Sequence, residues 1–412
     1  IAHGHNDYVF VLFCYGMRVS PNFSYLIYDF WIVMIYSNKR AECGGGCPYE
    51  PNDYYNYYWM YDVEEMTVAK NPWEVRPYAY GVWDIPFVKN REWHRIIGGT
   101  VGTDGILYVA LGQAGQVGEY DRPPLILTFS FPSNGTDYQL PTKAPTRKNS
   151  LTSKPSIIQV ASKGPTNRVV IPSIRPKTRV PIIKKSPQPT KQPTTKKLTS
   201  KPIKLNPSPF PNSGLPRAGI QDLEYLGAFR LKNGQFGISS VDWAVGALVY
   251  NPNRHSLFIV GHAHQNAIAE FPIVAAGKQT NVLDLPETPK PLQNFVDLLK
   301  KVDNPEVLDR ITGMMVIDGV LYVNAELWYD AVGVNKDTSL YVSDANNLAG
   351  SSVEGLFRLQ GAANCAGYMG RIPPEFQARF RGAEFYTGWP SIYSGFSRYS
   401  HGPSFGRFVL TI

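Results

Sequence analysis

Two histidines after an apolar run are the first residues whose spacing suggests chemistry. His262 and His264 stand in the sequence GHAH, directly after the run LFIV at residues 257–260. Alternate residues of an extended chain point to one face, so the two imidazoles are spaced as in a metal site. His3 and His5 have the same spacing. The alternative, which we favour, is that His262 closes a turn through a hydrogen bond.

Aromatic residues stand beside carboxylates at two predicted strand ends. Asp242 and Trp243 precede one predicted hairpin, and Glu326 and Trp328 follow another. A tryptophan ring stacks on a sugar ring, while a neighbouring carboxylate accepts hydrogen bonds from the sugar hydroxyls. These pairs therefore predict a carbohydrate-binding surface.

Three arginines lie near predicted strand starts: Arg76, Arg95 and Arg310. A guanidinium binds the carboxylate or sulfate of an acidic sugar through two parallel hydrogen bonds. Salt bridges between neighbouring structural repeats are an equally good interpretation. The sequence has no G-x-S-x-G, P-loop, dinucleotide-binding or H-E-x-x-H motif, so we assign no catalytic residue, metal site or cofactor.

Three related hairpins must position these residues. Residues 310–323 read RITGMMVIDGVLYV, two strand-like runs around an Asp318-Gly319 turn, which is a strong hairpin signal. Residues 95–109 repeat the pattern around Asp104-Gly105, and residues 246–260 repeat it more loosely around an Asn251-Pro252-Asn253 turn. We also expect strands at 8–14, 58–61, 82–87, 125–131, 226–231, 340–342 and 355–359, and a short helix at 291–301.

Hairpins that recur roughly every 60 residues, with no convincing run of long helices, are typical of large propeller blades. We therefore predict an all-β fold, a β-propeller of about five to seven blades that is either complete or incomplete. The 43% hydrophobic and 13% aromatic residues among 412 suit such a sheet protein.

A basic stretch divides the chain. Residues 138–217 hold 17 Lys and Arg and no Asp or Glu, which leaves 24 basic and 33 acidic residues elsewhere, a net charge of −9. The overall charge of +8 therefore belongs to one segment, and a nucleic-acid partner is not supported for the folded parts. The 15 prolines of this stretch predict a disordered, extended linker at 132–217 between propeller blades at 1–131 and 218–412. It serves either as a solvated spacer or as a tether to an acidic polysaccharide.

Four cysteines and two sequons bear on location. A disulfide from Cys14 to Cys43 or Cys47 is expected, because the N-x-S/T sequences at Asn22 and Asn134 suit a secreted glycoprotein. Free, buried thiols in a cytosolic protein are the alternative. The chain does not begin with Met, so we expect a fragment or a processed chain. The longest apolar run, residues 25–36, is too short to span a membrane.

Several phrases resemble a family of uncharacterised, mostly secreted β-propeller-like proteins from bacteria and algae. The phrases typical of the N-terminal half of that family are at residues 223–231, 257–262, 366–375 and 404–406. Those typical of its C-terminal half are at residues 13–16, 72–78, 95–99 and 123–126. The halves stand in swapped order here. One explanation is a circular permutation, with residues 125–131 and 223–231 in one closing blade, and the other is a fragment of two tandem propellers.

The resemblance implies a propeller and, like the residues above, leaves the function open between three classes. The first is an extracellular or cell-surface protein that binds a glycan or another surface macromolecule. The second is a polysaccharide lyase or hydrolase with its site at the mouth of the propeller channel. The third is a structural interaction scaffold, and the oligomeric state is not predicted.

Overall fold

The computed structural model describes residues 30–31, 56–62, 74, 76–89, 93–130, 218–244, 246–328, 330, 335–359, 361–372, 377–378, 380 and 382–388. They form antiparallel β-sheets joined by turns and short 3-10 helices, which confirms the all-β class. All of them belong to one unit, Ile1–Leu140 with Pro207–Ile412. The predicted strand at 8–14, the linker at 132–217, the three N-terminal cysteines and both sequons lie outside the described residues.

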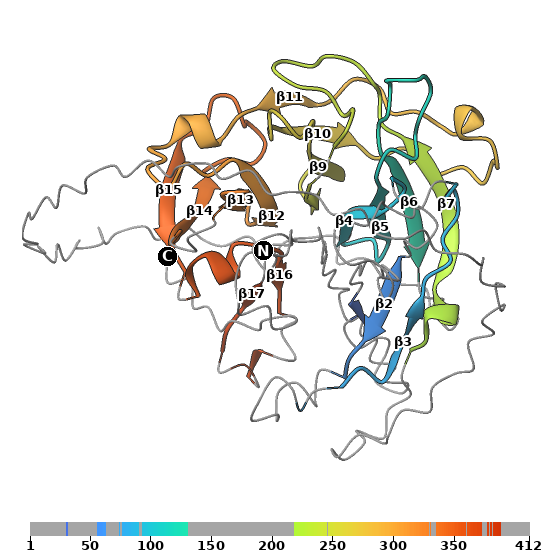
Figure 1. The fold of residues 1–412 in the computed structure, drawn as a ribbon, viewed down its shortest axis with the longest axis horizontal. Helices are drawn as coiled ribbons and strands as arrows, with labels where there is room; N and C mark the ends of the chain where they lie inside the picture. The colour runs from blue at the N-terminus through green and yellow to red at the C-terminus, as the bar shows by residue number, and fades with distance from the viewer. Residues whose placement is uncertain are drawn as a thin grey trace, which may run out of the picture. The chain divides into compact units, whose positions relative to one another are not determined.

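Three of the sheets have four strands each, and in each the strands follow one another in chain order (Figure 1). The first holds β4 (Ile96–Val101), β5 (Leu107–Leu111), β6 (Leu125–Ser130) and β7 (Glu224–Arg230). The second holds β8 (Leu248–Asn251), β9 (Ser256–Val260), β10 (Ile268–Pro272) and β11 (Gln293–Val296). The third holds β12 (Arg310–Ile317), β13 (Val320–Glu326), β14 (Asp337–Val342) and β15 (Val353–Arg358).

Two smaller sheets complete the described strands. One holds β1 (Phe30–Trp31), β2 (Tyr57–Met60) and β3 (Ala79–Val82), and the other holds β16 (Met369–Arg371) and β17 (Phe385–Thr387). The short 3-10 helices are η3 (Ile220–Asp222), η4 (Val282–Asp284), η5 (Leu299–Lys301) and η6 (Ala362–Cys365).

The β4–β7 sheet joins strands from both sides of residues 131–217. β6 pairs with β7 along its length, from Leu125 opposite Arg230 to Ser130 opposite Glu224 (Figure 1). Thr128 Oγ1 adds a hydrogen bond of 2.8 Å to the carbonyl of Gly227. The sheet is therefore complete only when both parts of the chain are present.

The three predicted hairpins are present, and their turns differ. Asp318 and Gly319 both have positive φ, 49° and 85°, as the two-residue turn requires. In the copy at 95–109, Gly105 has a positive φ but Asp104 does not. The loop there spans all five residues between β4 and β5. There Asp104 Oδ1 accepts the N–H of Ile106 at 3.0 Å, which holds the wider loop. The third turn covers residues 252–255.

Two other expectations were wrong. Residues 291–301 form β11 and η5 instead of a helix, because β11 adds to the edge of β10 and buries Phe295. The strand predicted at 82–87 ends at Val82: Pro86 and Phe87 form a turn, and Phe87 has φ 68°.

A bulge recurs at the start of two sheets. The β4–β5 register shifts between Ile96 and Gly98, and the β12–β13 register shifts between Ile311 and Gly313. A Cβ on Gly98 would lie 2.9 Å from the Leu248 amide, and one on Gly313 would collide with the Gly367 carbonyl. Glycine at each bulge therefore lets the next sheet approach backbone to backbone.

Neighbouring sheets share hydrophobic cores. Ile97, Tyr108 and Phe229 of the β4–β7 sheet pack with Ile259 and Phe271 of the β8–β11 sheet. A second cluster, which includes Phe258, Val260, Met314, Leu321 and Leu340, joins the β8–β11 and β12–β15 sheets.

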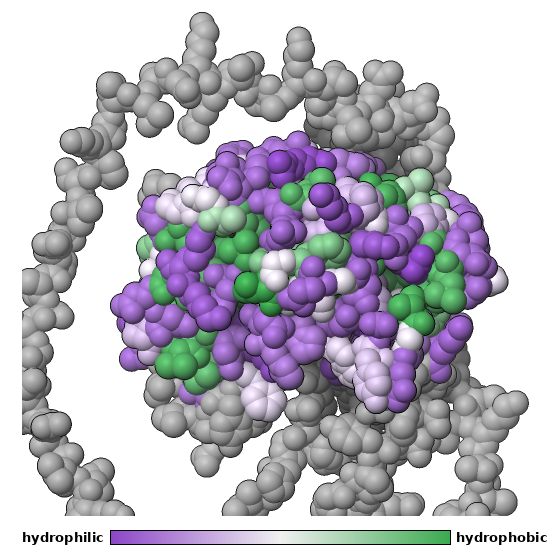
Figure 2. All heavy atoms as spheres, turned by 90° about the horizontal axis from the view of Figure 1, so that it is seen from above, coloured by the Kyte–Doolittle hydropathy of each residue, from purple (hydrophilic) through white to green (hydrophobic). Residues whose placement is uncertain are grey.

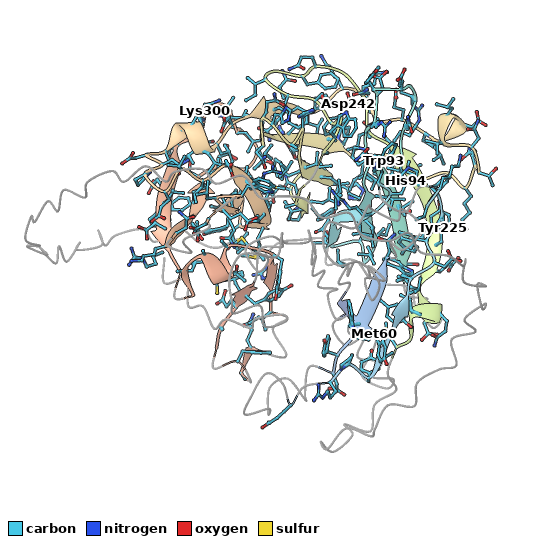
Figure 3. All side chains as sticks on the ribbon, viewed as in Figure 1. Met60, Trp93, His94, Tyr225, Asp242 and Lys300 are labelled. Atoms are coloured by element: carbon cyan, nitrogen blue, oxygen red, sulfur yellow. The ribbon has the colours of Figure 1, made fainter. Side chains whose placement is uncertain are left out.

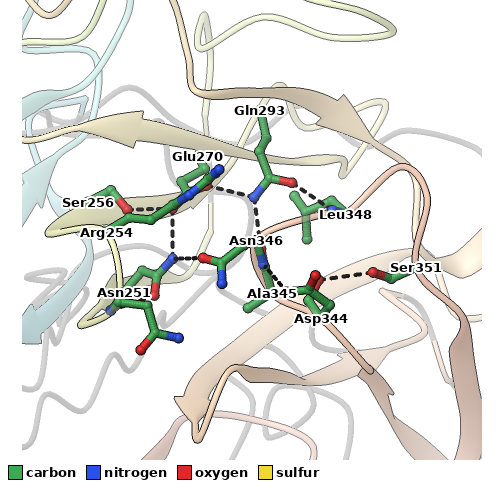
Figure 4. Close-up of polar contacts among 11 residues, drawn as sticks. Asn251, Arg254, Ser256, Glu270, Gln293, Asp344, Ala345, Asn346, Leu348 and Ser351 are labelled. Carbon is green, nitrogen blue, oxygen red and sulfur yellow. Dashed lines mark hydrogen bonds and ion pairs between the residues drawn. The ribbon is translucent and has the colours of Figure 1, made fainter. Parts of the chain in front are cut away.

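A buried carboxylate adds polar contacts between those two sheets (Figure 4). Glu270, which is 0% exposed, accepts hydrogen bonds from Asn251 and Ser256 at Oε1, and from Arg254 and Gln293 at Oε2. Gln293 and Asn251 continue to the β14–β15 connection, where they contact Ala345 and Asn346, respectively, and Gln293 also accepts the N–H of Leu348. Both carboxylate oxygens are thus satisfied, so we interpret Glu270 as structural.

Candidate functional site

Most of the predicted site residues lie at one edge of the sheets. Three contacts show that β6 and β8, β10 and β12, and β2 and β4 start at the same edge: Trp243 N–H to the Arg122 carbonyl (3.2 Å), Ile311 N–H to Asn266 Oδ1 (3.1 Å), and Ile96 N–H to Asn56 Oδ1 (3.3 Å). Antiparallel pairing puts the ends of β5, β9 and β13 there as well. We call this the strand-start edge.

Eight of the nine predicted residues are at the strand-start edge: Arg95, Asp242, Trp243, His262, His264, Arg310, Glu326 and Trp328. Arg76 is the exception, because it lies in the β2–β3 connection at the opposite edge.

Arg122, which the sequence interpretation missed, is the centre of the first group. Its guanidinium carbon lies 3.8 Å from the centre of the Trp93 ring and 4.9 Å from that of Trp243. A guanidinium over two indole faces gains cation–π attraction, which is strongest for tryptophan. Figure 3 shows Trp93 and Asp242, with His94, at the same end of the β4–β7 sheet. We call Trp93, Arg122, Asp242 and Trp243 the arginine–tryptophan site.

Backbone contacts hold Arg122 in place. Asp242 Oδ1 accepts the Arg122 N–H at 2.8 Å, and the Arg122 carbonyl accepts the Trp243 N–H. The guanidinium itself donates from Nε to the Glu119 carbonyl at 3.1 Å and from Nη1 to Gln113 Oε1 at 3.5 Å. The two oxygens that accept hydrogen bonds from the guanidinium are uncharged. Within the described ranges no carboxylate forms a salt bridge with Arg122.

One residue of the arginine–tryptophan site, and the glutamine that contacts its arginine, have strained backbones. Trp243 has φ 52° and Gln113 has φ 54°, in the left-handed region that bulky side chains rarely adopt. Such strain persists only where the surroundings impose it, and it is frequent at functional sites.

The two histidines lie next to this group, and their geometry confirms the turn interpretation. His262 Nδ1 accepts the backbone N–H of His264 at 3.1 Å, and the His262 N–H donates to the Ser240 carbonyl at 2.9 Å. The ring centres are 4.8 Å apart. The His262 Nδ1 lone pair is therefore already used. No cluster of three metal-ligating side chains occurs in the described part of the chain.

Burial brings the pKa values of Asp242 and His262 closer together. It raises the pKa of the Asp242 carboxyl above 3.8, although the Arg122 N–H and the Asn233 side chain oppose the shift. Burial, followed by the nearby His264, lowers the pKa of His262 below 6.5, while Asp242 opposes that change. A carboxyl of raised pKa beside an imidazole of lowered pKa has the composition of an acid–base pair.

A second group gathers around Trp328. The Arg310 guanidinium carbon lies 5.5 Å from the centre of the Trp328 ring, and Asp309 Oδ1 accepts the Trp328 N–H at 2.8 Å. Glu326 is buried and pairs with Arg310 across the β12–β13 ladder. Trp328 itself is 37% exposed.

Sequence reasoning missed Arg122 and Trp93 because each stands in a loop without a recognised motif. The available signal was position: Arg122 precedes Pro123-Pro124 and β6, and Trp93 precedes Arg95 and β4.

Comparison with protein-family models, with curated proteins and with solved structures finds no match to this chain. Within the described residues, no helix has the length and hydropathy needed to cross a membrane. The functional argument therefore rests on the geometry of the site.

Proposed function

We propose that the chain is a β-propeller that binds a glycan, or another surface macromolecule, outside the cell or at the cell surface. Contacts between the first strands of successive sheets support the propeller, with β8 against both β4 and β12, and β12 against β16. Burial raises the pKa of Tyr368, which precedes β16, and Cys365 and Tyr61 add to the shift; because Tyr61 follows β2, its proximity favours a ring of the five described sheets. Propeller sheets radiate around one axis in this way.

The pairing of β6 with β7 is what a circular permutation requires, and two halves of tandem propellers, which also have complementary open edges, would pair in the same way. In the permuted arrangement these two strands belong to one blade, and residues 131–217 are an insertion between its third and fourth strands. The two sequons and the N-terminal cysteine cluster support an extracellular or cell-surface location.

The observation that carries the binding proposal is the position of Arg122 against Trp93 and Trp243. Its guanidinium has aromatic contacts and two uncharged acceptors, so it retains hydrogen-bonding capacity for a ligand. Indole rings bind the C–H face of a sugar, while Asp242 and Arg122 bind hydroxyl or carboxylate groups. The face shown in Figure 2 is mostly hydrophilic, with several hydrophobic patches among the hydrophilic residues.

The test is binding of the full chain to an array of neutral, uronate-containing and sulfated oligosaccharides. We expect retention of at least one class, and a loss of about tenfold or more when Trp243 is changed to Ala. Trp243→Phe should retain part of the binding because it keeps a ring. Arg358→Gln, which removes an exposed arginine paired with Asp337, is the control. Unchanged binding by Trp243→Ala would contradict the proposal, and an array without any retention would favour the scaffold function.

The second candidate function is a polysaccharide lyase or hydrolase, favoured by the opposed pKa shifts of Asp242 and His262. A lyase needs a base for the proton beside a uronate carboxylate and an acid for the leaving oxygen. New reducing ends or ultraviolet-absorbing unsaturated uronates from polymer substrates, lost in both Asp242→Asn and His262→Ala, would establish this class. Retention without products would support a binding module.

A further inference from the structure

The tryptophan–arginine pair of the first site occurs a second time at the strand-start edge. In both places an arginine guanidinium lies over an indole ring, and an aspartate accepts the backbone N–H of one member of the pair. The first pair uses Arg122, Asp242 and Trp243. The second uses Arg310 and Trp328, with Asp309 as the aspartate.

The second pair comes from the best-matched repeat of the chain. β4 and β12 have the same bulge, and the paired positions place Arg310 in the β12–β13 sheet where Arg95 lies in the β4–β5 sheet. Trp328 follows β13 at the edge where Gln113 and Arg122 follow β5. Trp328 therefore lies in the loop equivalent to that of Arg122, whereas Trp243 lies in the β7–β8 connection, so the two pairs are built from different loops of one edge.

Hydrogen bonds hold the described residues around Trp328. Its N–H donates to Asp309, and further along the loop the Asn335 N–H donates to Asp330 Oδ2 at 3.0 Å. Asn335 Nδ2 donates to Glu306 Oε2 at 2.7 Å, which ties the loop to the β11–β12 connection. The contact with Asp309 fixes the backbone at Trp328, whose side chain is 37% exposed, so less entropy is lost there on binding.

The β8–β11 sheet lies between the two pairs. β8 contacts β4 on one side and β12 on the other, and the exposed His264 follows β9 at the same edge. Packed sheets are about 10 Å apart, so the pairs are separated by roughly 10–20 Å. A single sugar ring does not cover that distance, whereas an oligosaccharide chain does.

We propose that Trp328 and Arg310 form a second glycan subsite, so that the ligand is an extended polysaccharide chain lying along the strand-start edge from Trp243 past His264 to Trp328. This inference rests on the proposed glycan-binding function and adds to it the polymeric nature of the ligand. Two linked contacts raise affinity because the second binds at a high effective concentration.

The test uses the full chain with immobilised cello-, xylo- and galacturonate oligosaccharides of about two and about eight units. We expect an eight-unit chain to bind at least tenfold more tightly than the matching two-unit chain. Trp328→Ala should remove that advantage, so that the two lengths bind about equally through Trp243 alone, whereas Trp328→Phe should restore part of it. Phe357→Ala, which truncates another exposed aromatic ring on β15, is the matched control.

The outcomes separate the two proposals. If no oligosaccharide of the panel is retained, the glycan-binding function and the second subsite both fail. If the chain binds oligosaccharides but the two lengths bind equally, or Trp328→Ala keeps the length advantage, glycan binding stands and the second subsite is overturned. If Phe357→Ala lowers eight-unit binding as much as Trp328→Ala, the effect is not local and the subsite is likewise rejected.

Discussion

Glu270 and Arg122 are both charged side chains near the junctions between sheets, and their surroundings are opposite. Glu270 is 0% exposed and receives four hydrogen bonds, one of them an ion pair with Arg254 at 2.9 Å. Arg122 is half-buried, contacts two indole rings, and donates its side-chain hydrogen bonds to uncharged acceptors. A charge satisfied on every side contributes to the fold, whereas a charge with capacity left over is suited to a ligand.

The largest effect is expected at Glu270. Glu270→Ala leaves Arg254, Asn251 and Gln293 without their shared acceptor, and a buried donor left without its acceptor costs about 1–3 kcal/mol. Urea unfolding should therefore show a strongly lowered midpoint. The matched control is Glu287→Ala, which removes partly exposed salt bridges to Arg230 and Lys232 and should cost less than about 1 kcal/mol. Equal losses of stability in Glu270→Ala and Glu287→Ala would contradict the structural role assigned to Glu270.

At Arg122 we expect a large loss of binding and a small loss of stability. Arg122→Gln should weaken glycan binding by at least about tenfold, because it removes the planar cation, while the cation–π contacts it loses are worth only about 1–2 kcal/mol of stability. Arg122→Lys should also bind weakly, because the compact ammonium of lysine cannot donate two parallel hydrogen bonds as the planar guanidinium does. Calorimetric binding alongside thermal unfolding measures both quantities. A variant that unfolds readily but binds normally would make Arg122 a structural residue like Glu270.

A smaller effect at Gln113 tests whether the site stores strain. Because Gln113 has φ 54°, Gln113→Gly should be more stable than Gln113→Ala by about 1 kcal/mol. Both variants lose the 3.5 Å contact to Arg122 equally, so their difference isolates the backbone. Unfolding midpoints compared at one pH decide the matter, and a more stable Gln113→Ala would argue against strain.

The smallest effect concerns pH. Because the pKa of His262 is lowered in the folded chain, its contribution to stability is present above 6.5 and is lost as the pH falls through the folded pKa. The midpoint should therefore fall more from about pH 7.5 to about pH 5 in the wild type than in His262→Asn, whose Oδ1 replaces Nδ1 as acceptor. Asp242 acts with opposite sign, since its pKa is raised: its stabilising contribution is lost as the pH rises through the folded value. Parallel curves for wild type and His262→Asn would contradict this assignment.

Local signals in the sequence predicted the strands well. The Asp318-Gly319 turn needs two positive φ angles, and few sequences other than Asp-Gly provide them. The Asp104-Gly105 turn failed as a two-residue turn because the Asp104 side chain caps a wider loop. Residues 291–301 were mistaken for a helix because their apolar spacing is helical, whereas the position of Gln293 is determined by Glu270 and by the β14–β15 connection.

The candidate site was predictable only in part, for the same reason. Asp242 and Trp243 are neighbours in sequence, and pairs of this kind are visible without a structure. Arg122 and Trp93 reach them from other loops, through a contact between Arg122 and Trp243 that spans residues 131–217. Neither the periodicity nor the local propensity of a sequence predicts a contact of this kind, because the contact depends on how whole sheets pair.

The pairing of β6 with β7 also has a consequence for synthesis on the ribosome. When Leu125–Ser130 leaves the ribosome, its partner Glu224–Arg230 has not yet been translated. One edge of β6 therefore stays unpaired while more than eighty further residues are added. An unpaired strand edge of that kind pairs readily with strands of other chains and leads to aggregation. A nascent chain stalled before residue 218 should therefore depend on chaperones, and that dependence should end once β7 is available to complete the sheet.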